Sequence, residues 1–269
     1  MDDRFPPIVV EGLYKAYQRG HTKTPVLRGV DLRVERGECV FLAGPSGSGK
    51  TTLLSILGCI LSPDRGQVRI LQHEVHRLDP PARAAIRREK IGFLFQKLHL
   101  INGLTALENV CVPLMLRGKV GRAQRQRARD LLDRFGLHPK LASDPRNLSL
   151  GQCQRVALAR ALVGDPPLIL ADEPTASLDA ENGAAIMQMI RQLTRDEGRT
   201  AVVVTHDPRI FPLADRILHL DEGCIAAAPS TAGSPIRPRP VPGLLPADFP
   251  AACPDRRLET VPPESPYFT

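Results

Sequence analysis

A glycine-rich motif of eight residues constrains the fold of this chain more than any other feature of its sequence. Residues 44–51, Gly-Pro-Ser-Gly-Ser-Gly-Lys-Thr, match the phosphate-binding pattern G-x-x-x-x-G-K-[ST] at every position. An apolar run, Cys39 to Ala43, precedes the motif, and a leucine-rich segment beginning at Leu53 follows it. These flanks predict a strand, a P-loop and a helix within an α/β fold, where the alternative is an ordinary Gly/Ser turn.

The motif has the chemistry of a phosphate-binding site. Its glycines let consecutive backbone N–H groups curl around the β- and γ-phosphates of a nucleotide, Lys50 adds a positive charge, and the Thr51 hydroxyl can ligate Mg²⁺. The predicted nucleotide-binding residues of this segment are Gly44, Pro45, Ser46, Gly47, Ser48, Gly49, Lys50, Thr51 and Thr52. A P-loop indicates a nucleotide, but it does not identify the kind of protein that uses it.

Two further apolar runs end in polar side chains. Residues 168–171 predict a strand that leads to Asp172 and Glu173, as expected of a carboxylate that orients Mg²⁺ beside a base for water. The alternative is a buried strand with solvated acids at its tip. Residues 202–204 are all valine and lead to His206, although a single histidine at such a place is usually structural.

Another motif lies between the P-loop and the predicted strand that leads to Asp172 and Glu173. Ser149 and Gln152 have the spacing of a capping box, and the run from Arg155 to Leu162 that follows predicts a helix. On capping alone the segment needs no further function. A second short motif, Ser177-Leu178-Asp179, follows the acidic pair.

The order of these motifs resembles that of the ATP-binding subunits of ABC transporters over about residues 5–226. In family order the chain has the P-loop, Gln96 after the predicted strand 91–95, the segment Leu148-Ser149-Leu150-Gly151-Gln152, Asp172-Glu173, Ser177-Leu178-Asp179 and His206. Residues 92–96, 104–110 and 172–175 resemble most the lipoprotein-releasing and macrolide-export branch. The resemblance implies an α/β P-loop NTPase core, an N-terminal antiparallel β subdomain and an inserted helical subdomain at about residues 97–162.

The resemblance also implies ATP and Mg²⁺ as cofactors and assigns roles to single residues. Catalytic roles fall to Glu173, His206, Ser149, Gly151, Gln152 and Asp179, and metal binding to Thr51, Gln96 and Asp172. Tyr17 matches the aromatic residue that stacks on adenine, although Tyr14 is close by and a packed strand aromatic is the alternative. Leu150 departs from the family, which has glycine there. We expect a working but slower site, with a degenerate site as the alternative.

The same resemblance implies partners and a location. ATP would close a head-to-tail dimer of two copies, and the helical subdomain would pass the motion to a separate transmembrane permease, for export or for lipoprotein or lipid extrusion. A periplasmic adaptor would be reached through the permease, and the chain would lie peripherally on the cytoplasmic face of the inner membrane. One alternative is an ATPase that drives a periplasmic enzyme without transport. A DNA-associated ATPase fits less well, because the sequence has no long heptads or zinc module.

Charge and composition limit other functions. The net charge of +7 comes mostly from arginines in residues 83–88 and 117–129. No aromatic residues are interleaved with these arginines, so no nucleic-acid partner is expected, and the clusters predict solvated helix faces or contact with an anionic leaflet. No stretch reaches the roughly 18–20 apolar residues of a membrane span, and the acidic N-terminus is unlike a signal peptide. Six scattered cysteines predict reduced thiols in a chain that is not exported.

The remaining segments predict local structure. Short strands are expected at residues 8–10 and 30–34, with a polar loop from Arg19 to Thr24, and a basic helix is expected at residues 79–90. The apolar spacings of residues 128–135 and 186–193 predict two further helices. From residue 227 to 269 proline recurs without any period, which predicts a disordered tail outside the ATPase.

Overall fold

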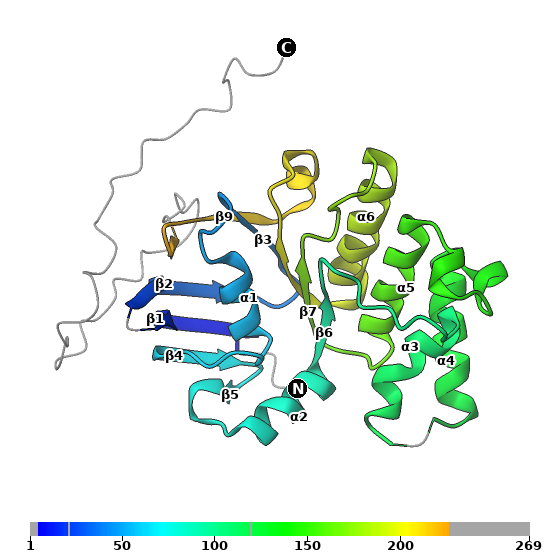
Figure 1. Ribbon diagram of the computed structural model, residues 1–269, viewed down its shortest axis with the longest axis horizontal. Helices are drawn as coiled ribbons and strands as arrows, with labels where there is room; N and C mark the ends of the chain where they lie inside the picture. The colour runs from blue at the N-terminus through cyan, green and yellow to red at the C-terminus, as the bar shows by residue number, and fades with distance from the viewer. Residues whose placement is uncertain (1–4, 21, 119, 226–269) are drawn as a thin grey trace, which may run out of the picture.

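The computed structural model describes residues 5–225 except 21 and 119, so the predicted tail at 227–269 lies outside the described residues. A six-stranded sheet forms the centre of the fold (Figure 1), in the order β10-β9-β3-β8-β7-β6. Its strands are β3 (Cys39–Ala43), β6 (Ile91–Leu94), β7 (Leu168–Asp172), β8 (Thr200–Val204), β9 (Arg216–Asp221) and β10 (Cys224–Ile225). All neighbours in it are parallel except β9 and β10.

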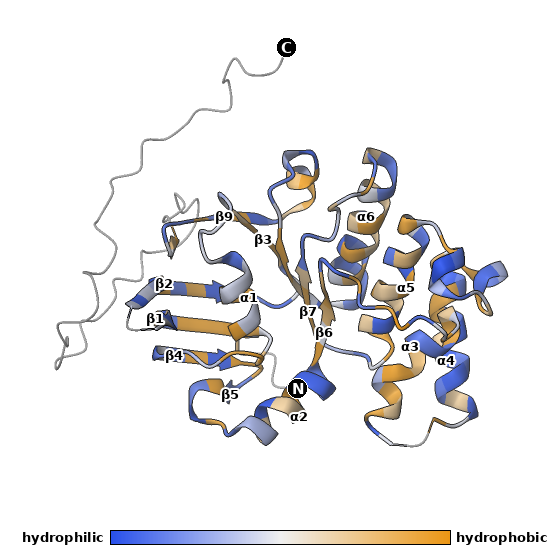
Figure 2. Ribbon diagram, in the orientation of Figure 1, coloured by the Kyte–Doolittle hydropathy of each residue, from blue (hydrophilic) through white to orange (hydrophobic). Residues whose placement is uncertain are grey.

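The central strands are apolar throughout because both faces of this sheet are covered. Every residue of β3, β7 and β8 is buried. Successive side chains point to opposite faces, so Phe41 and Val203 join one hydrophobic core while Leu42 and Val204 join the other. Figure 2 shows these strands as the hydrophobic centre of the molecule.

A second, antiparallel sheet has the order β2-β1-β4-β5. It consists of β1 (Ile8–Arg19), β2 (Thr22–Val34), β4 (Arg65–Ile70) and β5 (His73–Glu74), and helix α1 (Lys50–Leu57) lies between it and the central sheet (Figure 1). The N-terminal antiparallel β subdomain is therefore confirmed. The predicted polar loop from Arg19 to Thr24 is wrong, because β1 and β2 continue almost to the tip of a long hairpin. Pro25 pairs with Ala16 beside one of the register shifts, which interrupt the regular alternation of the hairpin.

The helices begin where the sequence places capping residues. They are α2 (Pro80–Lys90), α3 (Ala106–Met115), α4 (Arg122–Arg134), α5 (Leu150–Leu162) and α6 (Ala180–Glu197). Asp79 caps α2, Thr105 and Glu108 form a capping box at α3, and Ser149 and Gln152 form one at α5. Short 3₁₀ segments lie at Val75–Arg77, His138–Lys140, Pro145–Asn147 and Pro208–Leu213.

Three of these helices lie between β6 and β7 in the chain. Helices α3, α4 and α5 contribute Val110, Leu132 and Leu158 to one hydrophobic core, which also contains Phe41 of β3. This segment thus packs as a helical unit on the central sheet, at the right of Figure 1. None of the helices between residues 5 and 225 has the length and apolar character of a membrane-spanning segment.

The cysteines agree only in part with the expectation of reduced thiols. Cys39, Cys59, Cys111 and Cys153 are free. Cys224 is disulfide-bonded, so the expectation is wrong there. Burial raises the pKa of the Cys39 thiol to about 12 and that of Cys59 to about 11, so both thiols stay protonated at neutral pH.

Candidate active site

The predicted site residues gather at the edge where the parallel strands end. The P-loop follows β3, Gln96 follows β6, Glu173 follows β7 and His206 follows β8. These four strands are neighbours in the sheet and parallel, so their carboxyl ends lie side by side. In open α/β sheets this edge is where ligands bind.

The P-loop is built between β3 and α1. Gly44 has φ 145°, and a Cβ there would lie 2.0 Å from the backbone oxygen of Leu220 on β9, so only glycine fits. Lys50 is the first residue of α1 and is buried. Its Nζ donates to the carbonyl oxygens of Gly44 at 2.8 Å and Pro45 at 2.7 Å. Nζ also donates to the Ser48 hydroxyl at 3.5 Å, and a buried ammonium held only by neutral oxygens is well placed to bind a phosphate.

Two oxygen groups meet beside the loop. The Thr51 hydroxyl donates to Oδ1 of Asp172 at 3.4 Å, which joins the start of α1 to the end of β7. Burial, with the neighbouring charge of Glu173, raises the pKa of the Asp172 carboxyl. A cation at this point would relieve that unfavourable burial of charge.

The donor set fits Mg²⁺. Thr51 and Asp172 offer hard oxygen ligands, and the exposed Gln96 follows β6 at the same edge. Residues 5–225, as far as the structure describes them, contain no cluster of three His, Cys, Asp or Glu side chains able to hold a metal.

Glu173 and His206 form a pair next to Asp172. Oε1 of Glu173 lies 2.8 Å from Nδ1 of His206, and the Glu173 side chain is 13% exposed while that of His206 is 72% exposed. Glu173 has φ 49°, an unusual value for a residue with a side chain. Its N–H donates to the Val204 carbonyl at 2.9 Å, which fixes this turn against β8. A strained residue held in this way is often functional.

The structure distinguishes Tyr17 from Tyr14 as the candidate that could stack on adenine. Tyr17 is 41% exposed, and its hydroxyl lies 3.4 Å from Oγ1 of Thr52 on α1. Tyr14 is only partly exposed and packs against Gly29 of the hairpin. Of the two tyrosines, Tyr17 therefore presents an exposed ring beside the P-loop helix, as an adenine platform requires.

The signature segment starts α5. Ser149 caps the helix, since its hydroxyl accepts from the Gln152 N–H at 3.3 Å and Gln152 Oε1 accepts from the Ser149 N–H at 3.0 Å. Leu150 is the first helical residue and is 48% exposed. It is not among the described residues with positive φ, so leucine causes no backbone strain there. Free N–H groups and the helix dipole make this end suitable for an anion.

Asp179 lies beside that helix start and has a structural role within the chain. It caps α6 by accepting from the Asn182 N–H at 2.8 Å, and these hydrogen bonds lower the pKa of its carboxyl. The Asn182 side chain also donates to Asp179 and accepts from Arg155 of α5. A Cβ on Gly151 would lie 2.8 Å from Oδ1 of Asn182. Asp179 thus positions the signature segment through Asn182.

Sequence reasoning missed Asn182, Arg155 and Gln154. Gln154 is buried on α5 and donates to the Pro174 carbonyl at 2.7 Å, which ties the signature helix to the turn after Glu173. A signal was available, because Gln154 is a polar residue at a buried position of an otherwise apolar helix face.

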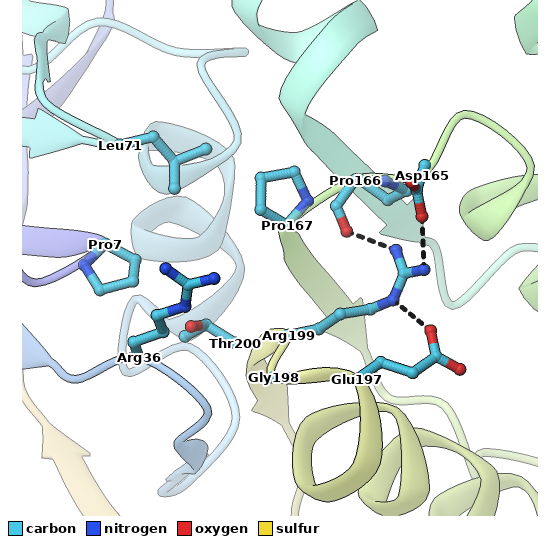
Figure 3. A pocket seen from close by; sticks show the side chains of 10 residues that line it. All are labelled: Pro7, Arg36, Leu71, Asp165, Pro166, Pro167, Glu197, Gly198, Arg199 and Thr200. Carbon is cyan, nitrogen blue, oxygen red and sulfur yellow. Dashed lines mark hydrogen bonds and ion pairs between the residues drawn. The ribbon is translucent and has the colours of Figure 1, made fainter. Parts of the chain in front are cut away.

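A cavity of about 180 Å³ lies at the opposite edge of the sheet, where β7 and β8 begin (Figure 3). Arg199 lies on one side of it and donates to the Pro166 carbonyl, Asp165 and Glu197. Since all three of its bonding groups are already paired, the guanidinium acts as a link between α6 and the turn before β7. This cavity is not the nucleotide site.

The structure brings one set of predicted residues together and keeps another apart. Thr51 contacts Asp172, Glu173 contacts His206, and Tyr17 contacts Thr52. In the described part of the chain no hydrogen bond or ion pair joins Ser149, Gly151 or Gln152 to the P-loop. The functional roles of all these residues stay predictions.

Fold and site together define a P-loop nucleotide-binding protein with a parallel core sheet and an inserted helical unit. The family model described as "ABC transporter" matches residues 27–176. The chain belongs to the ABC transporter family, as an ATP-binding cassette of the ATP-hydrolysing class. This confirms the family resemblance and the α/β fold.

Relatives and solved structures agree with this assignment. "Macrolide export ATP-binding/permease protein MacB 1" of Aeromonas hydrophila is 42% identical over 91% of this chain and 37% of its own length. The "MacB 1/2" protein of Paracoccus denitrificans is 45% identical over 87% and 35%. The chain thus spans about a third of the length of these curated relatives.

Two solved structures show the same fold. The dimeric ATP-binding cassette MJ0796 "bound to ADP and Pi" has a TM-score of 0.78 and 41% identity, covering 84% of this chain and 100% of that one. CbiO1 of Clostridium perfringens has a TM-score of 0.73 and 28% identity, covering 83% and 88%.

Proposed function

We propose that this chain binds MgATP at the carboxyl edge of the central sheet and hydrolyses it to drive a separate transmembrane permease. The observation that carries the proposal is the meeting of two pairs at that edge, Thr51 with Asp172 and Glu173 with His206. They lie next to a P-loop whose lysine is held by neutral oxygens alone.

Each group at this edge has a definite task. Lys50 and the backbone N–H groups of residues 46–51 bind the phosphates, and the exposed ring of Tyr17 stacks on the adenine. Thr51, Gln96 and Asp172 would hold Mg²⁺, which neutralises phosphate charge when it is bound. Glu173 accepts a hydrogen bond from the attacking water and polarises it. His206 holds the Glu173 carboxylate and contacts the γ-phosphate.

The site of one chain is half of a complete site. Ser149, Gly151 and Gln152 present an anion-binding helix end that contacts no P-loop group of its own chain. We infer that this end meets the γ-phosphate of a second copy, and that two copies close head to tail around ATP. The dimeric form of the related cassette MJ0796 supports this arrangement.

The coupling partner follows from the relatives. The relatives' names join an ATP-binding part to a permease and specify macrolide export. We therefore propose a permease partner, export as the direction, and a peripheral place on the cytoplasmic face of the membrane. A periplasmic adaptor reached through the permease belongs to the same proposal.

The test is the replacement Glu173→Gln, which keeps the shape of the side chain but removes the base. ATP binding should persist while turnover falls by a factor of roughly 10²–10⁴, the usual size of a general-base effect. Size-exclusion chromatography with ATP should then show an accumulated dimer. The matched control is Glu181→Gln, because Glu181 is an exposed carboxylate in the first turn of α6. Near-normal hydrolysis by the Glu173 variant would remove Glu173 from the base role.

A further inference from the structure

The positive charge of this chain is concentrated in two short segments. Residues 80–90 and 116–129 contain ten lysine and arginine side chains and a single acidic one, Glu89. Their nine net positive charges exceed the net charge of +7 of all 269 residues. The first segment is α2, and the second runs from the end of α3 into α4.

Contacts in the fold bring the two segments together. Arg117 donates to the carbonyl oxygens of Arg88 at the end of α2 and of Gly164. Arg127 of α4 pairs with Asp165, the residue after Gly164, at 3.0 Å. The end of α2, the turn after α3 and the middle of α4 therefore meet around one turn. In Figure 1 α2, the end of α3 and the start of α4 lie along the lower side of the molecule.

We call the described lysine and arginine side chains of residues 80–90 and 116–129 the basic surface. Several of these cations have no ion-pair partner. The side chains of Lys90, Arg122, Arg125 and Arg129 form no ion pair or hydrogen bond with any other residue that the structure describes. The nearby carboxylates are engaged elsewhere: Glu108 bonds to Thr105, Asp130 accepts from Gln126, and Asp133 pairs with His138. The three arginines are also exposed, so their charge faces solvent.

Apolar side chains are exposed within the same surface. Met115 is 48% exposed and Leu116 68% exposed, and they directly precede Arg117. Neither segment contains an aromatic residue. Single-stranded nucleic acid is bound through aromatic stacking as well as charge, whereas a lipid headgroup region offers phosphates above hydrocarbon. Guanidinium groups close to exposed leucine and methionine match a lipid headgroup region.

We propose that this basic surface, with Met115 and Leu116 at its centre, docks the protein directly on anionic phospholipid headgroups. Arginines bind the lipid phosphates, and the two apolar side chains enter the headgroup boundary. The contact is made with lipid and is additional to any contact with a permease. The inference does not rest on the proposed ATPase, because none of these residues lies at the nucleotide edge.

The test is co-sedimentation of the full 269-residue chain with lipid vesicles. Vesicles of phosphatidylcholine mixed with phosphatidylglycerol should bind the chain, vesicles of phosphatidylcholine alone should not, and added salt should release it. A basic residue near an anionic surface contributes about fivefold in affinity, or about 1 kcal/mol. Loss of two arginines alone predicts roughly thirtyfold weaker binding, so the charge-reversed double variant Arg122→Glu with Arg129→Glu should bind at least roughly thirtyfold more weakly. Leu116→Ser should bind severalfold more weakly.

A matched control separates the surface from net charge. Arg33→Glu with Arg195→Glu makes the same charge change at exposed positions of β2 and α6, and it should bind vesicles like the parent chain. ATP binding should be unchanged in all variants, which shows that they are folded. The proposal is overturned if the parent chain does not bind anionic vesicles, or if both double variants lose the same vesicle affinity. It is also overturned if Arg122→Glu with Arg129→Glu keeps its vesicle affinity and loses only affinity for a DNA duplex, measured in parallel.

Discussion

Three glycines of the P-loop have positive φ, and the surroundings of two of them, Gly44 and Gly47, predict opposite costs of substitution. Gly44 has φ 145°, and a Cβ there would lie 2.0 Å from the Leu220 backbone oxygen. Gly47 has φ 81°, and a Cβ there would have nothing within 4 Å. The two alanine variants therefore compare a methyl group that collides with the backbone of β9 with a methyl group that enters open space.

The cost at Gly44 follows from the displacement that it requires. An ordinary contact begins near 3.4 Å, so β9 must move away from the loop that follows β3. Backbone strain costs about 1–3 kcal/mol. Each strand hydrogen bond lost between β3 and β9 adds about 1 kcal/mol. With one such bond lost, we therefore expect Gly44→Ala to cost about 2–4 kcal/mol, or roughly 4–16 °C in Tm.

Gly47→Ala should cost only the backbone preference, about 1–2 kcal/mol. Its new methyl group points into the open side of the loop, where we place the phosphates, so nucleotide binding should suffer more than stability. Urea unfolding without nucleotide measures the stability difference. Repeating it with ATP measures the stabilisation by ligand, which should vanish for Gly47→Ala. Equal losses of stability in the two variants, or a larger loss at Gly47, would refute this reading of the loop.

Two further predictions concern the nucleotide and signature residues. Leu150→Gly relieves no backbone strain, so any gain in activity must come from removing the side chain. If the leucine obstructs dimer closure, the variant should raise ATPase activity by up to about tenfold, measured with the membrane partner present. Unchanged or lower activity would mean that the leucine is accommodated. Tyr17→Ala should raise the Kd for ATP by about two- to tenfold through lost stacking, whereas Tyr17→Phe should not. A titration with fluorescent nucleotide measures both, and equal effects would assign the affinity to the hydroxyl that contacts Thr52.

The sequence predicted where the motifs lie relative to their strands better than it predicted the sheets that carry them. The P-loop, Asp172 and Glu173 were placed correctly relative to their strands because each motif sits at the end of an apolar run, which is a local pattern. The length of the β1–β2 hairpin was not predictable, since Pro25 and register shifts hide the alternation of strand residues. Strand order is set by long-range packing, which single residues do not encode.

The residues that link the motifs were the least visible. Gln154 acts through the Pro174 carbonyl, and Asn182 acts through Arg155 and Asp179. Gln154 and Pro174 are 20 positions apart and Asn182 and Arg155 are 27 apart, so the sequence does not show which groups these polar side chains meet. Their effect is to hold the α5 N-terminus at a fixed place relative to the Glu173 turn.

A site shared by two copies makes a prediction that a site within one chain does not. Lys50→Ala removes the phosphate-binding lysine and Ser149→Ala removes the helix cap of the signature, so each homodimer should be inactive. In a mixed dimer, one site combines both defects while the other combines an intact P-loop from one copy with an intact signature from the other. Half of the randomly formed dimers are mixed, so the mixture should recover about a quarter of the parent ATPase activity. Two defects in a site confined to one chain cannot complement, so a mixture without recovery would place Ser149 outside the partner's site.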